Sequence, residues 1–181
     1  WIRDGGVVVA MGGASGYFVD AEITSARLVG EDEDDDDDAD QERQVGLAQA
    51  AYSGGVITGG TEDAPIRVPG AIMRATLDLT HPLTFGYENQ ALAVLVSGDD
   101  FYHPSKEGAN PVAFVGDDLR IAGYEWPDNT EEFLQNTAWM VDEPIGSGRL
   151  ILFADEPTFR LLWKSLDRLF LNGILFGPTI R

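Results

Sequence analysis

The side chains that most often perform chemistry in enzymes are scarce in this chain. It has 181 residues with no cysteine and two histidines, His81 and His103, each followed by proline. The lack of cysteine excludes disulfides, thiolate zinc sites and a cysteine nucleophile. Neither histidine begins a His-x-x-Glu or His-Glu-x-x-His pattern, the spacings typical of zinc enzymes. We therefore predict no metal or cofactor site in this chain and interpret both histidines as polar loop residues.

Ser15 is the candidate nucleophile that remains. It lies in the glycine-rich segment Gly12–Gly16, which does not match the Gly-x-Ser-x-Gly turn of serine hydrolases. An independent hydrolase that uses Ser15 with His81 or His103 is one alternative, and it predicts a Ser–His hydrogen bond of about 3 Å. A small-molecule binding module is a second alternative, because a glycine-rich bend before a helix can hold a phosphate. The segment lacks the Gly-x-Gly-x-x-Gly pattern of dinucleotide sites.

The charge of the chain is strongly negative. The formal net charge is −19, and ten of the 31 acidic residues lie between Glu31 and Glu42. We interpret residues 31–43 as a solvated, low-complexity insertion. A calcium-binding loop is the alternative, although the spacing lacks the EF-hand pattern. The charge argues against binding to nucleic acid or to an anionic membrane surface. No apolar run reaches 18 residues, so we also predict no membrane span.

The segment from Gly148 to Gly177 predicts the strand-to-helix unit around which the domain is built. Leu150–Phe153 is a short apolar run typical of a buried strand. Asp155-Glu156-Pro157 predicts the start of a helix, which Asn172-Gly173 can close. The predicted helix has one apolar face at three- and four-residue spacing, made of Phe159, Leu162, Trp163, Leu166, Leu169 and Phe170.

The other predicted elements precede this unit. Val7–Met11 is an apolar run typical of a parallel strand covered on both faces. The glycines after it predict a flexible bend, followed by a helix of uncertain length within residues 17–28. Alternation over residues 71–78 predicts a half-exposed strand. Further strands are expected at 92–96, 111–115, 119–124 and 139–141, with a turn at 144–148, a short helix within 44–60 and helix caps at 128–130. We expect one α/β domain over residues 1–181 with a mostly parallel sheet.

Three groups of residues occur in an order that is more specific than any one of them. The first is WIRDGGVVVAM at residues 1–11, and the second is VPGAI at 68–72 with HPLTFGY at 81–87. The third is the 148–177 unit, with Phe159-Arg160 and the LFLN run at 169–172. Together they resemble the class I glutamine amidotransferase-like domain at the C-terminal end of certain bacterial M14-type zinc carboxypeptidases. The similarity covers most of the chain outside the acidic insertion.

The resemblance implies a flavodoxin-like, three-layer fold that has lost amidotransferase catalysis. The family's nucleophilic cysteine corresponds to Gly12 here, or to Gly13 if the alignment is shifted by one residue. The family's histidine, in a Phe-His-Pro-Glu step, corresponds to Ala154, and Glu156 matches its glutamate. Without a thiolate and an imidazole there is neither a nucleophile nor a base. We therefore expect no catalytic residue in this chain and interpret Glu156 as a helix-start carboxylate.

The resemblance also implies a larger parent protein. The chain begins at Trp1 in what reads as the end of an element, so we expect it to be an excerpt of a longer polypeptide that supplies further strands. The zinc ligands of the carboxypeptidase would then lie in an upstream domain, which is the expected partner of this chain. The family is secreted or periplasmic, and we expect the same location here. The sequence leaves homo-oligomer formation open.

Overall fold

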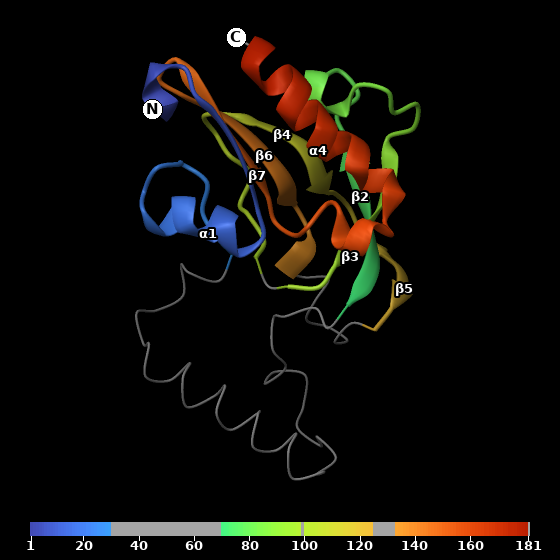
Figure 1. The fold of residues 1–181 in the computed structure, drawn as a ribbon. Helices are drawn as coiled ribbons and strands as arrows, with labels where there is room; N and C mark the ends of the chain where they lie inside the picture. The colour runs from blue at the N-terminus through green and yellow to red at the C-terminus, as the bar shows by residue number, and fades with distance from the viewer. Residues whose placement is uncertain (30–69, 99, 125–132, 181) are drawn as a thin grey trace, which may run out of the picture.

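A computed structural model describes residues 1–29, 70–98, 100–124 and 133–180. In these residues one sheet carries helix α4 (Lys164–Phe176) across one face, and helix α1 (Gly13–Asp20) lies beside the end of the sheet (Figure 1). The predicted α/β class is confirmed. The acidic insertion at 31–43, the short helix within 44–60 and the helix caps at 128–130 lie outside the described residues.

The sheet has seven strands and is mixed. Its order is β1-β7-β6-β4-β2-β3, and β5 also pairs with β2. Pairing is parallel between β1 and β7 and antiparallel in the five other described pairs. The strands are β1 (Val7–Met11), β2 (Ala71–Leu77), β3 (Ala91–Val96), β4 (Ala109–Phe114), β5 (Arg120–Gly123), β6 (Thr137–Ile145) and β7 (Gly148–Phe153).

The prediction of a mostly parallel sheet is therefore wrong. Parallel neighbours need a crossover of a dozen or more residues, whereas a tight turn forces the next strand to run back beside the first. Residues Gly146 and Ser147 alone join β6 to β7, and Gly146 has φ 65°, which a tight turn requires. The predicted 144–148 turn is shorter than expected, because β6 continues through Pro144 to Ile145.

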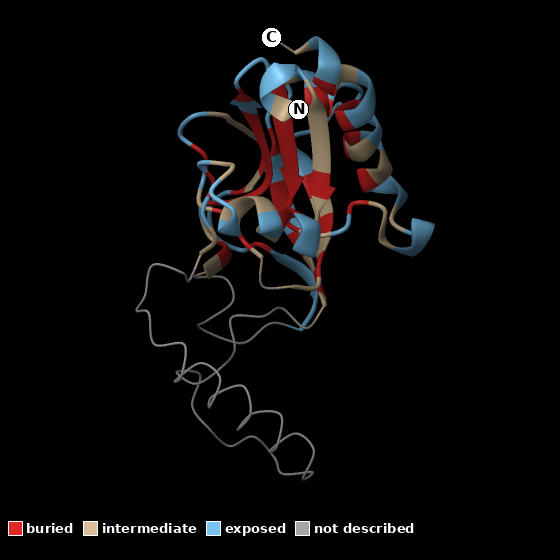
Figure 2. Ribbon diagram, turned by 60° about the vertical axis from the view of Figure 1, so that its left-hand side comes forward, coloured by how far each residue is buried: buried red, intermediate tan, exposed pale blue. Residues whose placement is uncertain are grey.

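The centre of the sheet is the most deeply buried part of the described chain (Figure 2). Every residue of β7 is buried, and so is every residue of β6 except Pro144. The alternation predicted for residues 71–78 is confirmed in β2, where Ala71, Met73, Ala75 and Leu77 are buried and the residues between them are not. The strand predicted at 7–11 is present with those bounds, and the strands predicted at 92–96, 111–115, 119–124 and 139–141 are present with shifted ends.

The helix of the 148–177 unit begins later than the sequence predicts. Phe159–Leu161 forms a 3-10 turn (η4), in which Arg160 and Leu161 have φ 48° and 56°. These left-handed conformations interrupt an α-helix, so α4 starts only at Lys164. Leu162, expected on the apolar face, is 75% exposed. The helix also continues past the predicted stop to Phe176.

Asn172 is a buried anchor of α4 rather than its end. Its Nδ2 donates hydrogen bonds to the carbonyl oxygens of Leu83 (2.8 Å) and Phe85 (2.9 Å), in and just after the 3-10 turn η3 (Pro82–Thr84). Gly173 lies next to it, and a Cβ there would lie 3.5 Å from Val9 and 3.7 Å from Ile151, so this part of α4 packs on the sheet at ordinary contact distance. No helix of the described residues is long and apolar enough to cross a membrane.

We expect the Asn172→Leu variant to lose about 2 kcal/mol of unfolding free energy, because the buried carbonyl group of Leu83 and the partly buried one of Phe85 lose their donor. Urea denaturation followed by circular dichroism measures the loss. The matched control is Leu171→Ala, whose side chain is 52% exposed, and we expect it to stay within about 0.5 kcal/mol of the parent chain. Equal stabilities of the two variants would contradict the anchoring role of Asn172.

Candidate functional site

The junction of β1 and α1 has the backbone form of a nucleophile elbow. Val7–Met11 ends the strand, Gly12 turns the chain with φ 53° and ψ −139°, and helix α1 begins at Gly13. A strand, a strained turn residue and a helix make up the elbow on which hydrolases and related enzymes expose a nucleophile. The predicted flexible bend over residues 12–16 is therefore wrong, since residues 13–16 form the first turn of α1.

Glycine occupies the position at which such an elbow would carry its reactive side chain. A Cβ built on Gly12 would meet no atom within 4 Å, so a side chain there would project into open space. The Gly12 N–H donates to the carbonyl oxygen of Phe153 (3.1 Å), which fixes the turn against the end of β7. The elbow is thus held in place by the sheet although it carries no functional group.

The position predicted for a catalytic histidine lies at the neighbouring strand end. Met11 pairs with Phe153 in the parallel ladder, so Gly12 and Ala154 are the first residues past the pairing on β1 and β7. Ala154 is 6% exposed, and its N–H donates to the carbonyl oxygen of Trp139 (2.9 Å). The structure therefore brings these two positions together, with glycine at one and a buried methyl group at the other.

The acidic residues that follow Ala154 have structural partners. Asp155 Oδ2 accepts hydrogen bonds from the backbone N (2.7 Å) and Oγ (2.9 Å) of Ser97, which tie the end of β7 to the end of β3. Glu156 is exposed and accepts a hydrogen bond from Thr158 Oγ1 at 3.3 Å. The prediction that Glu156 marks a helix start is wrong, because α4 begins eight residues later, at Lys164.

Ser15 is buried under the elbow and fully engaged. Its Oγ lies 2.5 Å from the carbonyl oxygen of Gly12 and 3.0 Å from that of Phe153, and it accepts a hydrogen bond from the Tyr102 hydroxyl at 2.5 Å. Burial raises the pKa of the Tyr102 hydroxyl above its usual value. Among the described residues no histidine bonds Ser15, so the geometry does not support the hydrolase alternative. A Cβ built on Gly12, Gly13 or Gly16 would meet no atom within 4 Å, and the small-molecule binding module at this segment stays a prediction.

The two histidines contact other parts of the described chain. His81 Nδ1 accepts a hydrogen bond from the Leu83 N–H (3.3 Å), and its Nε2 lies 3.2 Å from Asp142 Oδ2. The backbone N–H of His103 donates to the carbonyl oxygen of Arg27 (2.8 Å). In the described residues no group of three or more histidine, cysteine, aspartate or glutamate side chains could hold a metal ion.

Sequence reasoning missed the buried charges of the β6–β7 hairpin. Arg149 Nη1 donates to Asp142 Oδ1 at 2.7 Å, and the Asp142 side chain has no exposed surface. On the neighbouring residue, the Glu143 carboxylate accepts from Thr24 Oγ1 and from the backbone N–H of Ser25, each at 2.8 Å. The sequence contains a sign of these buried charges, because two acidic residues interrupt the otherwise apolar strand at residues 137–145.

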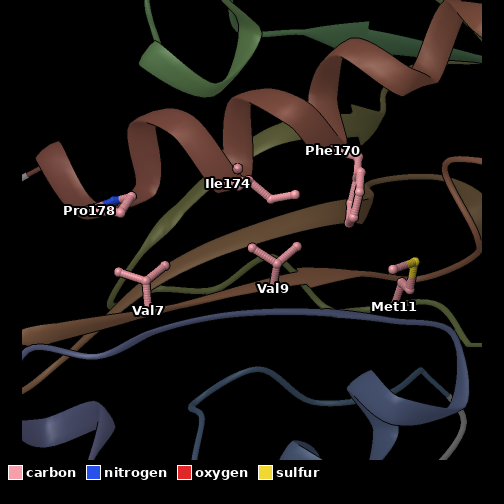
Figure 3. A pocket seen from close by; sticks show the side chains of 7 residues that line it. Val7, Val9, Met11, Phe170, Ile174 and Pro178 are labelled. Atoms are coloured by element: carbon pink, nitrogen blue, oxygen red, sulfur yellow. The ribbon is translucent and has the colours of Figure 1, made fainter.

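A pocket lies between β1 and α4, on the described part of the chain, and Met11 at the end of β1 is one of its lining residues. This hollow has a volume of about 360 Å³ and is lined by apolar side chains (Figure 3). It is made of Val7, Val9, Met11, Phe170, Gly173, Ile174 and Pro178. None of these residues carries a group for acid–base or nucleophilic chemistry, so the hollow is suited to apolar contact and not to catalysis.

Comparison of the chain with protein-family models, with curated proteins and with solved structures gives no match.

We expect cysteine introduced at the elbow to report its geometry. The thiol of the Gly12→Cys variant should react rapidly with Ellman's reagent in the folded protein, because nothing covers the Cβ position. The thiol of the Ser15→Cys variant should react at least about a hundredfold more slowly, because Ser15 is buried. The native chain has no cysteine, so each variant has one thiol. Full and equal reaction of both variants in urea is the control, and equal rates in the folded state would contradict the elbow.

Proposed function

We propose that this chain is a non-catalytic, class I glutamine amidotransferase-like domain that serves as an accessory domain of a zinc carboxypeptidase. The observation that carries the proposal is the elbow: Gly12 stands at the nucleophile position and Ala154 at the base position, side by side at the ends of β1 and β7. The turn residue Gly12 has φ 53° and ψ −139°, a backbone conformation that is open to glycine and strained for residues with a side chain. Retention of the elbow without a reactive group is what a domain derived from an enzyme would display.

The unit made of β1, Gly12, α1 and β7 is the part of the structure that supports this proposal. Its strands are parallel, and its turn has the strand–turn–helix form of a nucleophile elbow. The antiparallel strands β2 to β6 depart from a flavodoxin-like sheet. The flavodoxin-like relationship is therefore proposed for the elbow unit, with the antiparallel strands as a divergent part.

In this proposal the chemistry belongs to the upstream domain and the present chain is its partner. The zinc ion would be held there, as the resemblance implies. The parent protein would be secreted or periplasmic, as the resemblance implies. The described chain would contribute binding surface and stability to the parent and no reacting group.

We expect the chain to release no ammonia from glutamine and no C-terminal residue from a blocked dipeptide, with or without added zinc. Enzyme-coupled ammonia detection and chromatography of the dipeptide products measure both activities. The two reactive groups that acyl transfer requires are absent from the elbow. Clear turnover of either substrate would contradict the proposal, provided that the activity disappears when the protein is removed by immunodepletion.

A gain-of-reactivity experiment tests the assignment of the two positions. In the Gly12→Cys/Ala154→His double variant, an adjacent imidazolium should lower the thiol pKa. The rate of alkylation by iodoacetamide at pH 6.5 should then rise about tenfold over that of Gly12→Cys alone. Gly12→Cys/Ala154→Leu is the matched control, since leucine adds bulk at the buried position without a base. Equal rates in two folded double variants would mean that Gly12 and Ala154 are not the nucleophile and base positions.

A further inference from the structure

His81 lies where the turn η3 meets the β6–β7 hairpin. It directly precedes Pro82–Thr84, and its side chain is 13% exposed, so water can still reach the ring. Nδ1 accepts a hydrogen bond from the backbone N–H of Leu83 at 3.3 Å and thereby caps the turn. Nε2 lies 3.2 Å from Oδ2 of Asp142 in β6. The two nitrogens of one ring therefore contact two separate parts of the fold.

The contact at Nδ1 requires a neutral ring. A ring nitrogen that accepts an N–H carries no proton, so the single proton of the neutral imidazole is on Nε2. A second proton would have to bind Nδ1, where it would face the Leu83 N–H as one donor against another. Leu83 is 0% exposed, so its amide would lose its acceptor without being solvated in return. A protonated His81 is thus incompatible with the capped turn.

The contact at Nε2 favours a charged ring. The Asp142 side chain has no exposed surface, and its Oδ1 is paired with Arg149 Nη1 at 2.7 Å. Its Oδ2 accepts no hydrogen bond from the described residues, although the Nε2 of His81 lies 3.2 Å away. A buried carboxylate oxygen without a partner is destabilising, and an imidazolium at this distance would compensate it. The two sides of the ring therefore favour opposite protonation states.

The other charged groups around the turn leave this conflict in place. Hydrogen bonds from the Thr80 hydroxyl and N–H, and to a smaller extent the charge of His81, lower the pKa of Asp78, so this carboxylate also attracts a proton to the ring. Arg149 lies behind Asp142, whose Oδ1 it binds. On α4, Arg168 Nη1 donates to the carbonyl oxygen of Gly86 at 2.7 Å, after the turn. The carboxylate that contacts the ring, that of Asp142, has the largest effect on it.

We propose that His81 is a proton-sensitive latch of the η3 turn. With a neutral ring, Nδ1 holds the Leu83 N–H and the turn is closed. With a protonated ring, His81 pairs with Asp142 and releases that N–H. The carbonyl oxygens of Leu83 and Phe85 accept hydrogen bonds from Asn172 of α4, so opening of the turn loosens the anchor of this helix. An ordinary imidazole changes charge near pH 6.5, so the latch responds between about pH 5 and 8.

Nuclear magnetic resonance of the isotopically labelled full chain, from about pH 8 down to about pH 5, tests the latch. At the high end, the nitrogen shifts of the His81 ring should report a proton on Nε2. As the ring is protonated, the Leu83 backbone amide and the Asn172 side-chain amide should shift with the same midpoint. The hydrogen-exchange protection of the Leu83 amide, corrected for the intrinsic effect of pH, should fall about fivefold or more, since one hydrogen bond is lost.

Three variants separate the proton from the cap. His81→Asn keeps a side-chain acceptor that can cap the turn but does not titrate, so its Leu83 amide should stay protected over the whole pH range. His81→Phe has no acceptor, so its Leu83 amide should lack this protection at every pH. The matched control is His103→Asn, which removes the other histidine of the chain, and its Leu83 amide should titrate as in the parent. Circular dichroism confirms that each variant is folded.

Several results would overturn the proposal. A neutral His81 ring with its proton on Nδ1 would mean that it does not accept the Leu83 N–H. A ring that takes up no proton above about pH 5, or a Leu83 amide that stays unchanged while the ring is protonated, would make His81 a purely structural residue. A Leu83 titration that persists in folded His81→Asn would belong to another group, such as Asp78. The results on the parent chain decide the question even where a variant does not fold.

Discussion

The parallel pairing of β1 with β7 is the interaction on which the rest of the interpretation depends. It joins Val7–Met11 to residues 149–153, which are far away in the chain, and it is the one parallel pair in the described sheet. Because the two strands run in the same direction, their carboxyl ends meet at one edge. Gly12 and Ala154 become neighbours for this reason alone. The same pairing uses one side of β1, and among the described residues no strand pairs with its other side.

The hairpin of β6 and β7 provides the rigid support for that pairing. Both strands are buried, and the hairpin nevertheless contains Asp142, Glu143 and Arg149. A buried charge without a partner would be strongly destabilising, whereas a paired one is tolerated. Arg149 pairs with Asp142, and Glu143 receives three described hydrogen bonds from elements outside the hairpin. The charges therefore specify which segments pack on the hairpin, including the loop that follows α1.

The elbow has the backbone of a nucleophile turn without a reactive side chain at Gly12. The backbone of Gly12 and the network of Ser15, Tyr102 and the Phe153 carbonyl make a well-defined turn, in which the hydroxyl groups of Ser15 and Tyr102 are buried. The proposed accessory role rests on this combination of a well-defined turn and the lack of a side chain at Gly12.

The sequence by itself determined the local elements whose residues report their own environment. Alternation over residues 71–77 and the apolar run at 150–153 identified β2 and β7, because side-chain periodicity follows directly from strand geometry. The tertiary structure decided the features that the local pattern does not encode. Strand direction depends on hairpins such as the one at Gly146-Ser147, and α4 starts late because Arg160 and Leu161 are left-handed. The burial of Ser15 and Asn172 depends on the segments that pack against them. The elbow was predictable only as a family expectation. Its geometry required β7 to lie beside β1, and pairing across so long a stretch of chain leaves no local pattern in the sequence.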